Sequence, residues 1–384
     1  MIPQLRFPEF TDEWQVKKLG DIAKKVGDRN GESFAEVVLT NSAVRGVIPQ
    51  SDYFDKDIAV QGNLANYYKA AKDDFVYNPR ISVSAPVGPF KRNHFGDGVM
   101  SPLYNLYRFK SGEVLGYLEQ YLSTTFWHKY MKGVANYGAR SDRMAISSDD
   151  LLKIPFPYPK KPEQQKIADF LGAIDDKLTS AQNKVAAMRE YKKGVMQALF
   201  SGKLRFKDEN GNPYPDWEEK KLGDLLDYEQ PTKYIVNSTD YDDRHHTPVL
   251  TAGKTFILGY TDEADGIFEN NLPVIIFDDF TTASHLVDFP FKVKSSAMKI
   301  LKAKSGVNIK VAYELLNQIR FSAEDHKRYW IGTYQDFTVK LPSPKEQKKI
   351  TDFISAIDEK IKLEEAKLAS SKEFKKALLQ RMFV

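Results

Sequence analysis

The sequence predicts an α+β protein in which two tandem α/β domains are separated by two long helices that form an antiparallel coiled coil. Two observations carry this prediction. The segment Lys161–Phe200 recurs as Pro344–Phe383 without a gap, and its apolar residues have helical spacing. A shorter segment at the start of the chain recurs directly after the first long segment. The chain is therefore a tandem pair of an opening segment, a variable body and a long helix.

The opening segment at Pro3–Asp21 recurs at Lys203–Asp224. Trp14 matches Trp217, and Lys-Leu-Gly-Asp ends both copies. The second copy is longer, and its extra residues fall in the stretch Asp-Glu-Asn-Gly-Asn-Pro-Tyr-Pro-Asp, whose composition is typical of a turn.

The two bodies, roughly 22–155 and 225–341, are predicted to hold short strands and one helix each. In the first body the predicted strands are Glu36–Thr40, Phe75–Tyr77 and Leu103–Phe109, and the helix is Glu113–Met131. In the second body the strands are Pro248–Thr251, Val274–Phe277 and Ala297–Leu301, and the helix is Val311–Arg320. A mixed or antiparallel sheet is expected in each. The bodies share little sequence, whereas their flanks are nearly duplicated. We therefore expect two modules with the same kind of function that act on different targets.

Both long helices follow a proline cluster, where a helix starts rather than continues. The first helix has apolar residues at alternating steps of four and three, namely Ile167, Leu171, Ile174, Leu178, Ala181, Val185, Met188, Val195 and Leu199, with Lys192 as the interruption. In the second helix the seam is Ile350, Ile354, Ile357, Ile361, Leu368, Leu378 and Met382, with Glu364, Ser371 and Lys375 in seam positions. Each helix should be about 60 Å long and needs a partner, most simply the other copy. The alternative is two ordinary surface helices of duplicated domains.

Composition sets wider limits. The 384 residues suffice for two domains, and the absence of cysteine excludes disulfides, thiolate metal sites and a cysteine nucleophile. A net charge of +4 permits a polyanionic partner without requiring one. Since the chain has neither a long apolar run nor a charged and then apolar leader, we expect a soluble, cytoplasmic protein without a membrane partner.

Motifs of common enzymes are incomplete. Ala252–Thr255 contains Gly-Lys-Thr, but Pro248 occupies the position of the leading glycine of a phosphate loop. Asn78-Pro79-Arg80 only partly matches the tetrapeptide of adenine methyltransferases and is better interpreted as a turn at a strand end. Asp278-Asp279 is interpreted as a loop or strand-end pair rather than a metal site, and the six histidines lack metal-ligand spacing. We therefore expect no catalytic residue, metal or cofactor in this chain.

Several loops mix cationic, amide and aromatic side chains, as nucleic-acid contact segments do. The candidate DNA-binding residues are Lys91, Arg92, Asn93, His94, Tyr137, Arg140, Ser141, Arg143, Arg244, His245, Thr282, Ser284, His285, Lys327, Arg328 and Tyr329. Arginine can bind guanine through two hydrogen bonds, asparagine can do likewise with adenine, and lysine binds phosphates. For any single residue, a solvated surface role is the alternative. The segments 137–143 and 326–333 precede the two proline clusters and so occupy equivalent places.

The duplicated helix starts Pro159–Lys177 and Pro342–Lys360, the Trp-to-Lys-Leu-Gly-Asp segments, and the phrases Tyr77-Asn78-Pro79 and Ser101-Pro102-Leu103-Tyr104 resemble the specificity subunit of type I restriction–modification enzymes. The resemblance covers essentially the whole chain. It implies target recognition domains at 1–155 and 203–341, each reading half of a split DNA sequence, and spacer helices at 156–202 and 342–384.

The resemblance also implies partners. Double-stranded DNA would be bound by the recognition domains, two methylation subunits would dock on the helices, and restriction subunits would join through that complex. S-adenosylmethionine, ATP and magnesium would be bound by the partner subunits and none by this non-catalytic chain. Two alternatives remain at this point. The chain could be a stand-alone DNA methyltransferase or nuclease with an unrecognised active site, or a coiled-coil interaction protein that binds no DNA.

Overall fold

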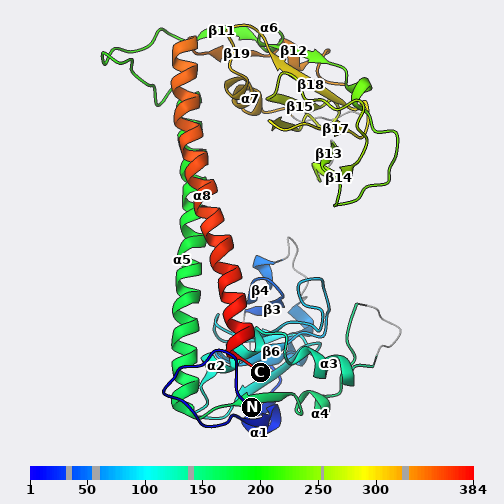
Figure 1. The fold of residues 1–384 in the computed structure, drawn as a ribbon, viewed down its shortest axis with the longest axis vertical. Coiled ribbons are helices and arrows are strands. Elements are labelled where there is room, and N and C mark those ends of the chain that lie inside the picture. Colours follow the sequence, from blue (N-terminus) through cyan, green and yellow to red (C-terminus); the bar gives the residue numbers. More distant parts are fainter. Residues whose placement is uncertain (32–36, 54–60, 137–141, 252–254, 322–327) are drawn as a thin grey trace. The chain divides into compact units, whose positions relative to one another are not determined.

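The computed structural model describes residues 1–31, 37–53, 61–136, 142–251, 255–321 and 328–384, with the side chains of 61–63 left aside. The chain forms two units, Met1–Lys184 with Glu365–Val384, and Val185–Glu364. We call them the first and the second unit. Each unit contains one body and a part of both long helices, α5 (Lys161–Phe200) and α8 (Pro344–Met382) (Figure 1). The domain boundaries predicted at residues 155, 202 and 341 divide the sequence differently and stay a prediction.

The described elements of the first body follow in chain order. They are β1 (Gln15–Lys18), α1 (Leu19–Ile22), β2 (Ala23–Val26), β3 (Val38–Ser42), β4 (Gly46–Pro49), the 3-10 helices η1 (Gln50–Asp52) and η2 (Gln61–Asn66), β5 (Tyr68–Ala70), β6 (Phe75–Tyr77), β7 (Phe90–Arg92), β8 (Gly98–Met100), β9 (Asn105–Phe109), α2 (Leu115–Leu122), α3 (His128–Val134), α4 (Ser148–Leu151) and β10 (Pro155–Tyr158).

The second body has β11 (Glu218–Lys221), α6 (Leu222–Leu225), β12 (Leu226–Glu229), η3 (Pro231–Tyr234), β13 (Thr247–Leu250), β14 (Ile257–Thr261), β15 (Val274–Asp278), β16 (Ser284–Val287), β17 (Lys292–Val293), β18 (Met298–Ala303), α7 (Ile309–Asn317), η4 (Tyr334–Asp336) and β19 (Thr338–Leu341).

The larger sheets of the two bodies have the same strand order although the sequences differ, and the smaller sheets are similar but have four and three strands. The first has a sheet of order β2-β9-β6-β7, and the second has β12-β18-β15-β16. A smaller sheet of order β4-β3-β8-β5 matches β14-β13-β17, and in both sheets one pair is parallel, β3 with β8 and β13 with β17. The strands predicted from alternation and turn composition coincide with β3, β6, β9, β13, β15 and β18 to within a few residues. The α+β fold class is confirmed, with an antiparallel larger sheet and a mixed smaller sheet in each body.

One predicted helix was wrong. Glu113–Met131 was expected to be continuous, but α2 ends at Leu122 and α3 starts at His128. The Thr124 hydroxyl donates a hydrogen bond to the carbonyl of Tyr121 (2.7 Å), and Trp127 Nε1 donates to the carbonyl of Leu122 (3.2 Å). These side chains bond to carbonyls at the end of α2, and such local competition stops a helix that apolar spacing alone would continue.

The duplicated helix start has a physical reason in the structure. Glu163 in the first turn of α5 receives two hydrogen bonds from Arg6, at 2.7 and 2.8 Å, and the next residue, Gln164, donates to the carbonyl of Pro159 (2.8 Å). The second copy repeats both contacts, because Arg205 binds Glu346 at 2.9 Å twice and Gln347 donates to Pro342 (2.8 Å). In both copies an arginine of the opening segment therefore binds a glutamate in the first turn of the following long helix, and we call this contact the joint.

The end of each long helix completes the unit of the other repeat. Leu378, Leu379, Met382 and Phe383 belong to the core of the first unit, and Met196, Leu199 and Phe200 belong to the core of the second. The ring of Phe383 lies 5.4 Å from that of Tyr117 and 6.4 Å from that of Trp14, whereas Phe200 lies 5.9 Å from Trp217. Figure 1 shows this end of α8 beside α2 and β6.

The lysines that interrupt the apolar seam pair with aspartates of the opposite helix. Lys375 of α8 binds Asp175 of α5 in the first unit (2.5 Å), and Lys192 of α5 binds Asp358 of α8 in the second (2.6 Å). The two contacts are repeats of one another, since both the lysines and the aspartates are 183 positions apart. Ascending numbers on one helix meet descending numbers on the other, as an antiparallel coiled coil requires. A polar pair within an apolar seam is a recognised way to fix helix register.

Reversing the charge at one of these lysines tests their role in the register. Lys375→Glu is expected to lower the melting temperature, by an amount equivalent to roughly 1 kcal/mol, because it places a second carboxylate against Asp175. Adding Asp175→Lys should restore most of the loss. Thermal unfolding of the two variants measures both effects, and an equal melting temperature for Lys375→Glu and the unmodified chain would contradict the assignment.

Candidate nucleic-acid interface

The tip of the β6–β7 hairpin in the first unit is held by the segment that follows α3. The amide of Ile81 donates to the carbonyl of Asp142 (3.0 Å), that of Met144 donates to Pro79 (3.0 Å), and Arg80 pairs with Arg143. Asn78 closes the turn after β6, because its side-chain oxygen accepts the amide of Arg80 (3.0 Å). The interpretation of Asn78-Pro79 as a strand-end turn is confirmed.

The second unit builds the same arrangement from different residues. Asp278 closes the turn after β15 by accepting the Phe280 amide (2.9 Å) and the Thr281 hydroxyl (2.6 Å). Asp279 is buried near Lys299 (3.4 Å), and its carboxylate accepts the amide of Trp330 (2.8 Å). The strand-end interpretation of this acidic pair is confirmed.

We call these two places the hairpin-tip surfaces, made of residues 79–85 with 142–145 in the first unit, and 279–283 with 328–331 in the second. Arg80 and Val83 are exposed on the first, Val83 completely, whereas Arg328 and Ile331 are exposed on the second. The guanidinium of Arg328 lies 6.0 Å from the centre of the Phe280 ring. Sequence reasoning missed Arg80, although the turn motif that contains it was noticed.

Backbone strain lies at the second tip. Thr282, a predicted DNA-binding residue, has φ +63°, a left-handed conformation that a β-branched residue rarely adopts. Its amide donates to the carbonyl of Asp278 (2.9 Å), which holds the turn. Strained residues of this kind cluster at functional sites.

Of the remaining tip residues predicted from sequence, Arg143 is 22% exposed and lies 3.6 Å from Asp142. Tyr137, Arg140, Ser141 and Lys327 lie outside the described residues. Tyr329 is described but only 1% exposed, since its ring packs against Phe321 in the core. It holds the tip through its backbone, whose amide donates to Asp279 (2.9 Å).

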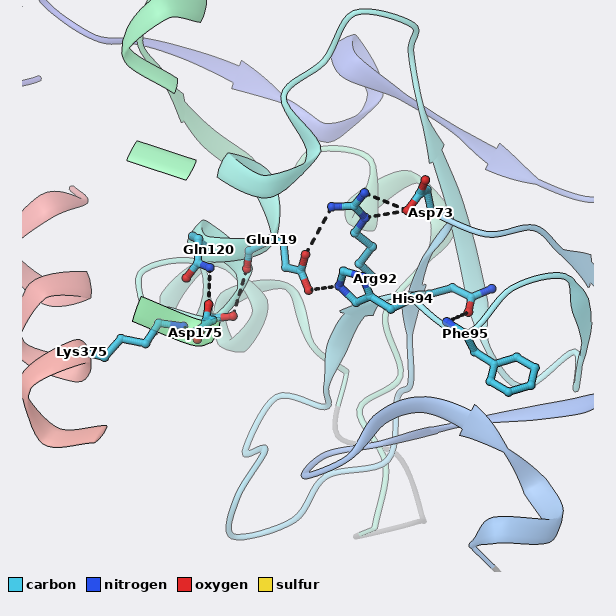
Figure 2. Close-up of polar contacts among 10 residues, drawn as sticks. Asp73, Arg92, His94, Phe95, Glu119, Gln120, Asp175 and Lys375 are labelled. Carbon is cyan, nitrogen blue, oxygen red and sulfur yellow. Dashed lines mark hydrogen bonds and ion pairs between the residues drawn. The ribbon is translucent and has the colours of Figure 1, made fainter. Parts of the chain in front are cut away.

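The predicted segment Lys91–His94 faces α2 instead. Figure 2 shows Arg92 between Asp73 (2.8 Å) and Glu119 (3.5 Å), with His94 Nε2 at 2.6 Å from Glu119. The hydrogen bond to Glu119 raises the pKa of His94, whereas burial lowers the pKa of Lys91. Asn93 has no exposed surface, and its amide nitrogen donates to the carbonyls of Ala71 (2.8 Å) and Gly96 (2.7 Å).

This cluster continues into the long helices. Gln120, the neighbour of Glu119 on α2, donates to Asp175 of α5 (2.7 Å), and Asp175 also holds Lys375 of α8 (Figure 2). The cations of the segment are thus neutralised by carboxylates of their own unit. Their arrangement suits a joint between the body and the helices better than a surface that attracts phosphates.

In the second unit, β16 occupies the sheet position that β7 has in the first. Ser284 donates to Asn317 of α7 (2.7 Å), and the ring of His285 stacks on Phe256 at 4.0 Å. Burial lowers the pKa of His285, which favours the neutral ring. The predicted residues of β16 are therefore also tied to their own unit, although less completely than Lys91–His94.

Arg244 and His245 lie on the loop before β13. Arg244 is 89% exposed and binds Asp242 (2.5 Å), and this contact lowers the pKa of Asp242 to about 2. His245 is half-buried, and its amide donates to the carbonyl of Asp242 (3.0 Å). Arg244 is therefore a cation that projects into solvent from the second body.

Within the described ranges, no group of three or more histidine, aspartate or glutamate side chains is placed to hold a metal ion. The Gly-Lys-Thr candidate falls largely on residues 252–254, outside those ranges. No helix of the described parts of the chain is both long enough and apolar enough to span a membrane.

Comparison with known proteins agrees with this duplicated architecture. A family model for the type I restriction modification DNA specificity domain matches residues 11–187 and again 214–371. The type I restriction enzyme EcoR124I/EcoR124II specificity subunit of Escherichia coli is 50% identical over 133 residues, a third of each chain. The putative MjaX specificity subunit of Methanocaldococcus jannaschii is 26% identical over 222 residues, which are 52% of this chain and 45% of that one. The chain thus spans at most about half the length of these relatives.

Solved structures share the fold along the whole chain. The type I restriction–modification S subunit from M. genitalium aligns over 100% of this chain and 99% of its own, with a TM-score of 0.58 and 14% identity. A second structure, described under complex assembly and conformational transition of the type I R-M system, covers 97% and 98%, with a TM-score of 0.56 and 13% identity. Because the family model matches most of the chain, once in each repeat, the chain belongs to the type I restriction modification DNA specificity family.

Proposed function

We propose that this chain gives a type I restriction–modification complex its DNA specificity by reading a bipartite double-stranded target, one half-site with each unit. One observation carries the proposal. The units have the same strand order, yet their hairpin-tip surfaces present different side chains, Arg80 with Arg143 in one and Phe280 with Arg328 in the other. The same scaffold with different tips suits the same task on different base sequences.

The chemistry of the tips supports duplex DNA as the ligand. Exposed arginines can bind guanine O6 and N7 in the major groove or contact phosphates, and an apolar residue such as Val83 can contact a thymine methyl group. Arg244 adds an exposed cation on the second body. Asn93 and Tyr329 are left out of the proposed interface because their side chains are buried.

We further propose that the long helices dock two methylation subunits, and through them restriction subunits. The support is the repeat itself, since near-duplicate helices offer near-duplicate surfaces to two copies of one partner. In this proposal methyl transfer, ATP hydrolysis and cleavage belong to the partner chains, which bind S-adenosylmethionine, ATP and magnesium, and the complex works in the cytoplasm.

The test uses the full chain with and without the methylation subunit. Given labelled S-adenosylmethionine and DNA, the chain alone should transfer no methyl group, and the complex should methylate a split sequence. Methyl transfer by the purified chain alone would favour a stand-alone methyltransferase. A complex that shifts DNA without sequence preference would favour a coiled-coil interaction protein.

Substitution at the first tip should affect one half-site only. Arg143→Ala is expected to weaken binding of that half-site by about 1–3 kcal/mol if the side chain reads a base. We expect the same of Arg140→Ala. Binding of the complex to DNAs altered in one half-site or the other measures this effect, with Lys177→Ala on the exposed face of α5 as the control. Equal loss at both half-sites would contradict the assignment.

A further inference from the structure

Each long helix exposes an aromatic ring at an equivalent position. Tyr191 of α5 lies in the second unit and Phe374 of α8 in the first, and both are 59% exposed. They are 183 positions apart, the same offset that relates the two helices throughout. A single exposed ring is ordinary at a protein surface, but a ring at the same place in both repeats is what a contact made twice would require.

The surroundings of the two rings are also repeated. The first lies in Arg-Glu-Tyr-Lys-Lys-Gly (189–194) and the second in Lys-Glu-Phe-Lys-Lys-Ala (372–377), and every position has the same burial class in both copies. Four residues before and three residues after each ring, on the same helix face, stand exposed small residues, Ala187 and Gly194 in one copy and Ser370 and Ala377 in the other. A Cβ added at Gly194 would meet nothing within 4 Å. The neighbouring side chains on this face of the helix are therefore small and exposed, and each ring projects beyond them into solvent.

The middle of the repeat behaves differently. Leu363 of α8 is 55% exposed, but its counterpart on α5 is Ser180. Apolar exposure alone is therefore not duplicated, whereas the aromatic position with its small neighbours is. Leu363 provides a matched control for any effect of an exposed apolar side chain on the same helix.

The two rings share an apolar face but not a hydroxyl, since one copy has tyrosine and the other phenylalanine. Burial of the ring is thus the common interaction, and a hydrogen bond from the phenol is not. Stacked base pairs of duplex DNA offer no free ring face for such a contact, whereas a pocket on a protein does. Exposed aromatic residues that become fully buried in a partner are typical anchors of protein interfaces.

From these observations we propose that Tyr191 and Phe374 are the equivalent anchors for two copies of one protein partner, each copy accepting one ring in an apolar pocket. Resting on the proposed function, the inference assigns that partner as the methylation subunit, one copy per unit. The pocket's rim should carry carboxylates, because Lys193 and Lys376 flank the rings at equivalent exposed positions. Lys376 also lies 3.6 Å from Glu373 on its own helix, in an exposed pair, whereas Lys192 and Lys375 are paired with aspartates of the opposite helix.

The experiment measures how many methylation subunits bind the full chain, by native mass spectrometry and by titration. Tyr191→Ala should weaken one of the two sites about 10- to 100-fold, and Phe374→Ala should weaken the other. The double variant should lose both copies at concentrations that saturate the unmodified chain. Tyr191→Phe should bind normally, and Leu363→Ala should leave both sites unchanged.

The outcomes separate this inference from the proposed function. If the unmodified chain binds no methylation subunit, the proposed function itself fails. If it binds two copies and Tyr191→Ala behaves like Leu363→Ala, the function stands and the anchors are wrong. Weaker DNA binding by the double variant in the absence of the methylation subunit would assign the rings to DNA and overturn the inference. Thermal unfolding should be unchanged in all variants, because the rings are exposed.

Discussion

Replacing Arg6 with methionine is expected to lower the free energy of unfolding of the first unit by about 3–5 kcal/mol. The Glu163 carboxylate is 2% exposed and takes two hydrogen bonds from this guanidinium, itself only 11% exposed. The variant leaves a buried charge without its partner, which costs more than the intact pair contributes. Urea titration followed by hydrogen exchange in peptides of the first unit measures the change.

Two further variants calibrate this result. Lys166, on the same helix as Glu163, forms an ion pair with Glu9 of the opening segment, and these side chains are 47% and 44% exposed. Lys166→Met removes this pair, and the loss should stay below about 1 kcal/mol. Arg205→Met in the second unit should cost less than Arg6→Met, because Trp217 still donates to Glu346 (2.9 Å). Among the described residues Trp14 Nε1 has no such acceptor.

Removing the buried charge as well should recover stability. Arg6→Met combined with Glu163→Leu is expected to be more stable than Arg6→Met alone, since no carboxylate is then left without a partner. A loss for Arg6→Met as small as that for Lys166→Met would mean that the joint does not hold the opening segment on the helix.

The repeat made the architecture predictable, but it did not reveal what the repeat motifs bind. Apolar spacing placed the seam through Ile167 and Leu171, and both residues lie in the core of the first unit. The same spacing marked Lys192 only as an interruption. Its partner Asp358 lies 166 positions away, and no local pattern connects the two. Contacts between distant segments are what a single sequence leaves open.

The sequence predicted which segments form the candidate site better than it predicted which of their side chains are exposed. The segments before the proline clusters do meet the hairpin tips, as Arg143 and Tyr329 show. Composition did not reveal the direction of side chains, so buried Asn93 and Tyr329 were predicted beside exposed Arg328. Arg80 lies in a turn whose sequence partly matches an enzyme motif, and such a pattern does not indicate a DNA contact.

Inserting one heptad into each long helix is expected to change the DNA target that the complex reads. The insertion falls in Ala181–Met188 of α5 and in the equivalent Glu364–Ser371 of α8, which contain the points where the two units divide. Seven residues lengthen a helix by about 10 Å, and they rotate the residues after the insertion by only about 20° around the helix axis. In the proposed function this length corresponds to about 3 base pairs of duplex.

Binding of the complex to DNAs with different gaps between the half-sites measures the effect. The original target should fall to non-specific affinity, a loss of about 10³-fold or more, and a target with about 3 additional base pairs should regain it. Deleting a heptad from both helices is the matched control and should shift the preferred gap the other way. Both variants keep the seam in phase, since a whole heptad preserves the apolar repeat. If both variants still prefer the original gap between the half-sites, the length of the helices does not set that gap.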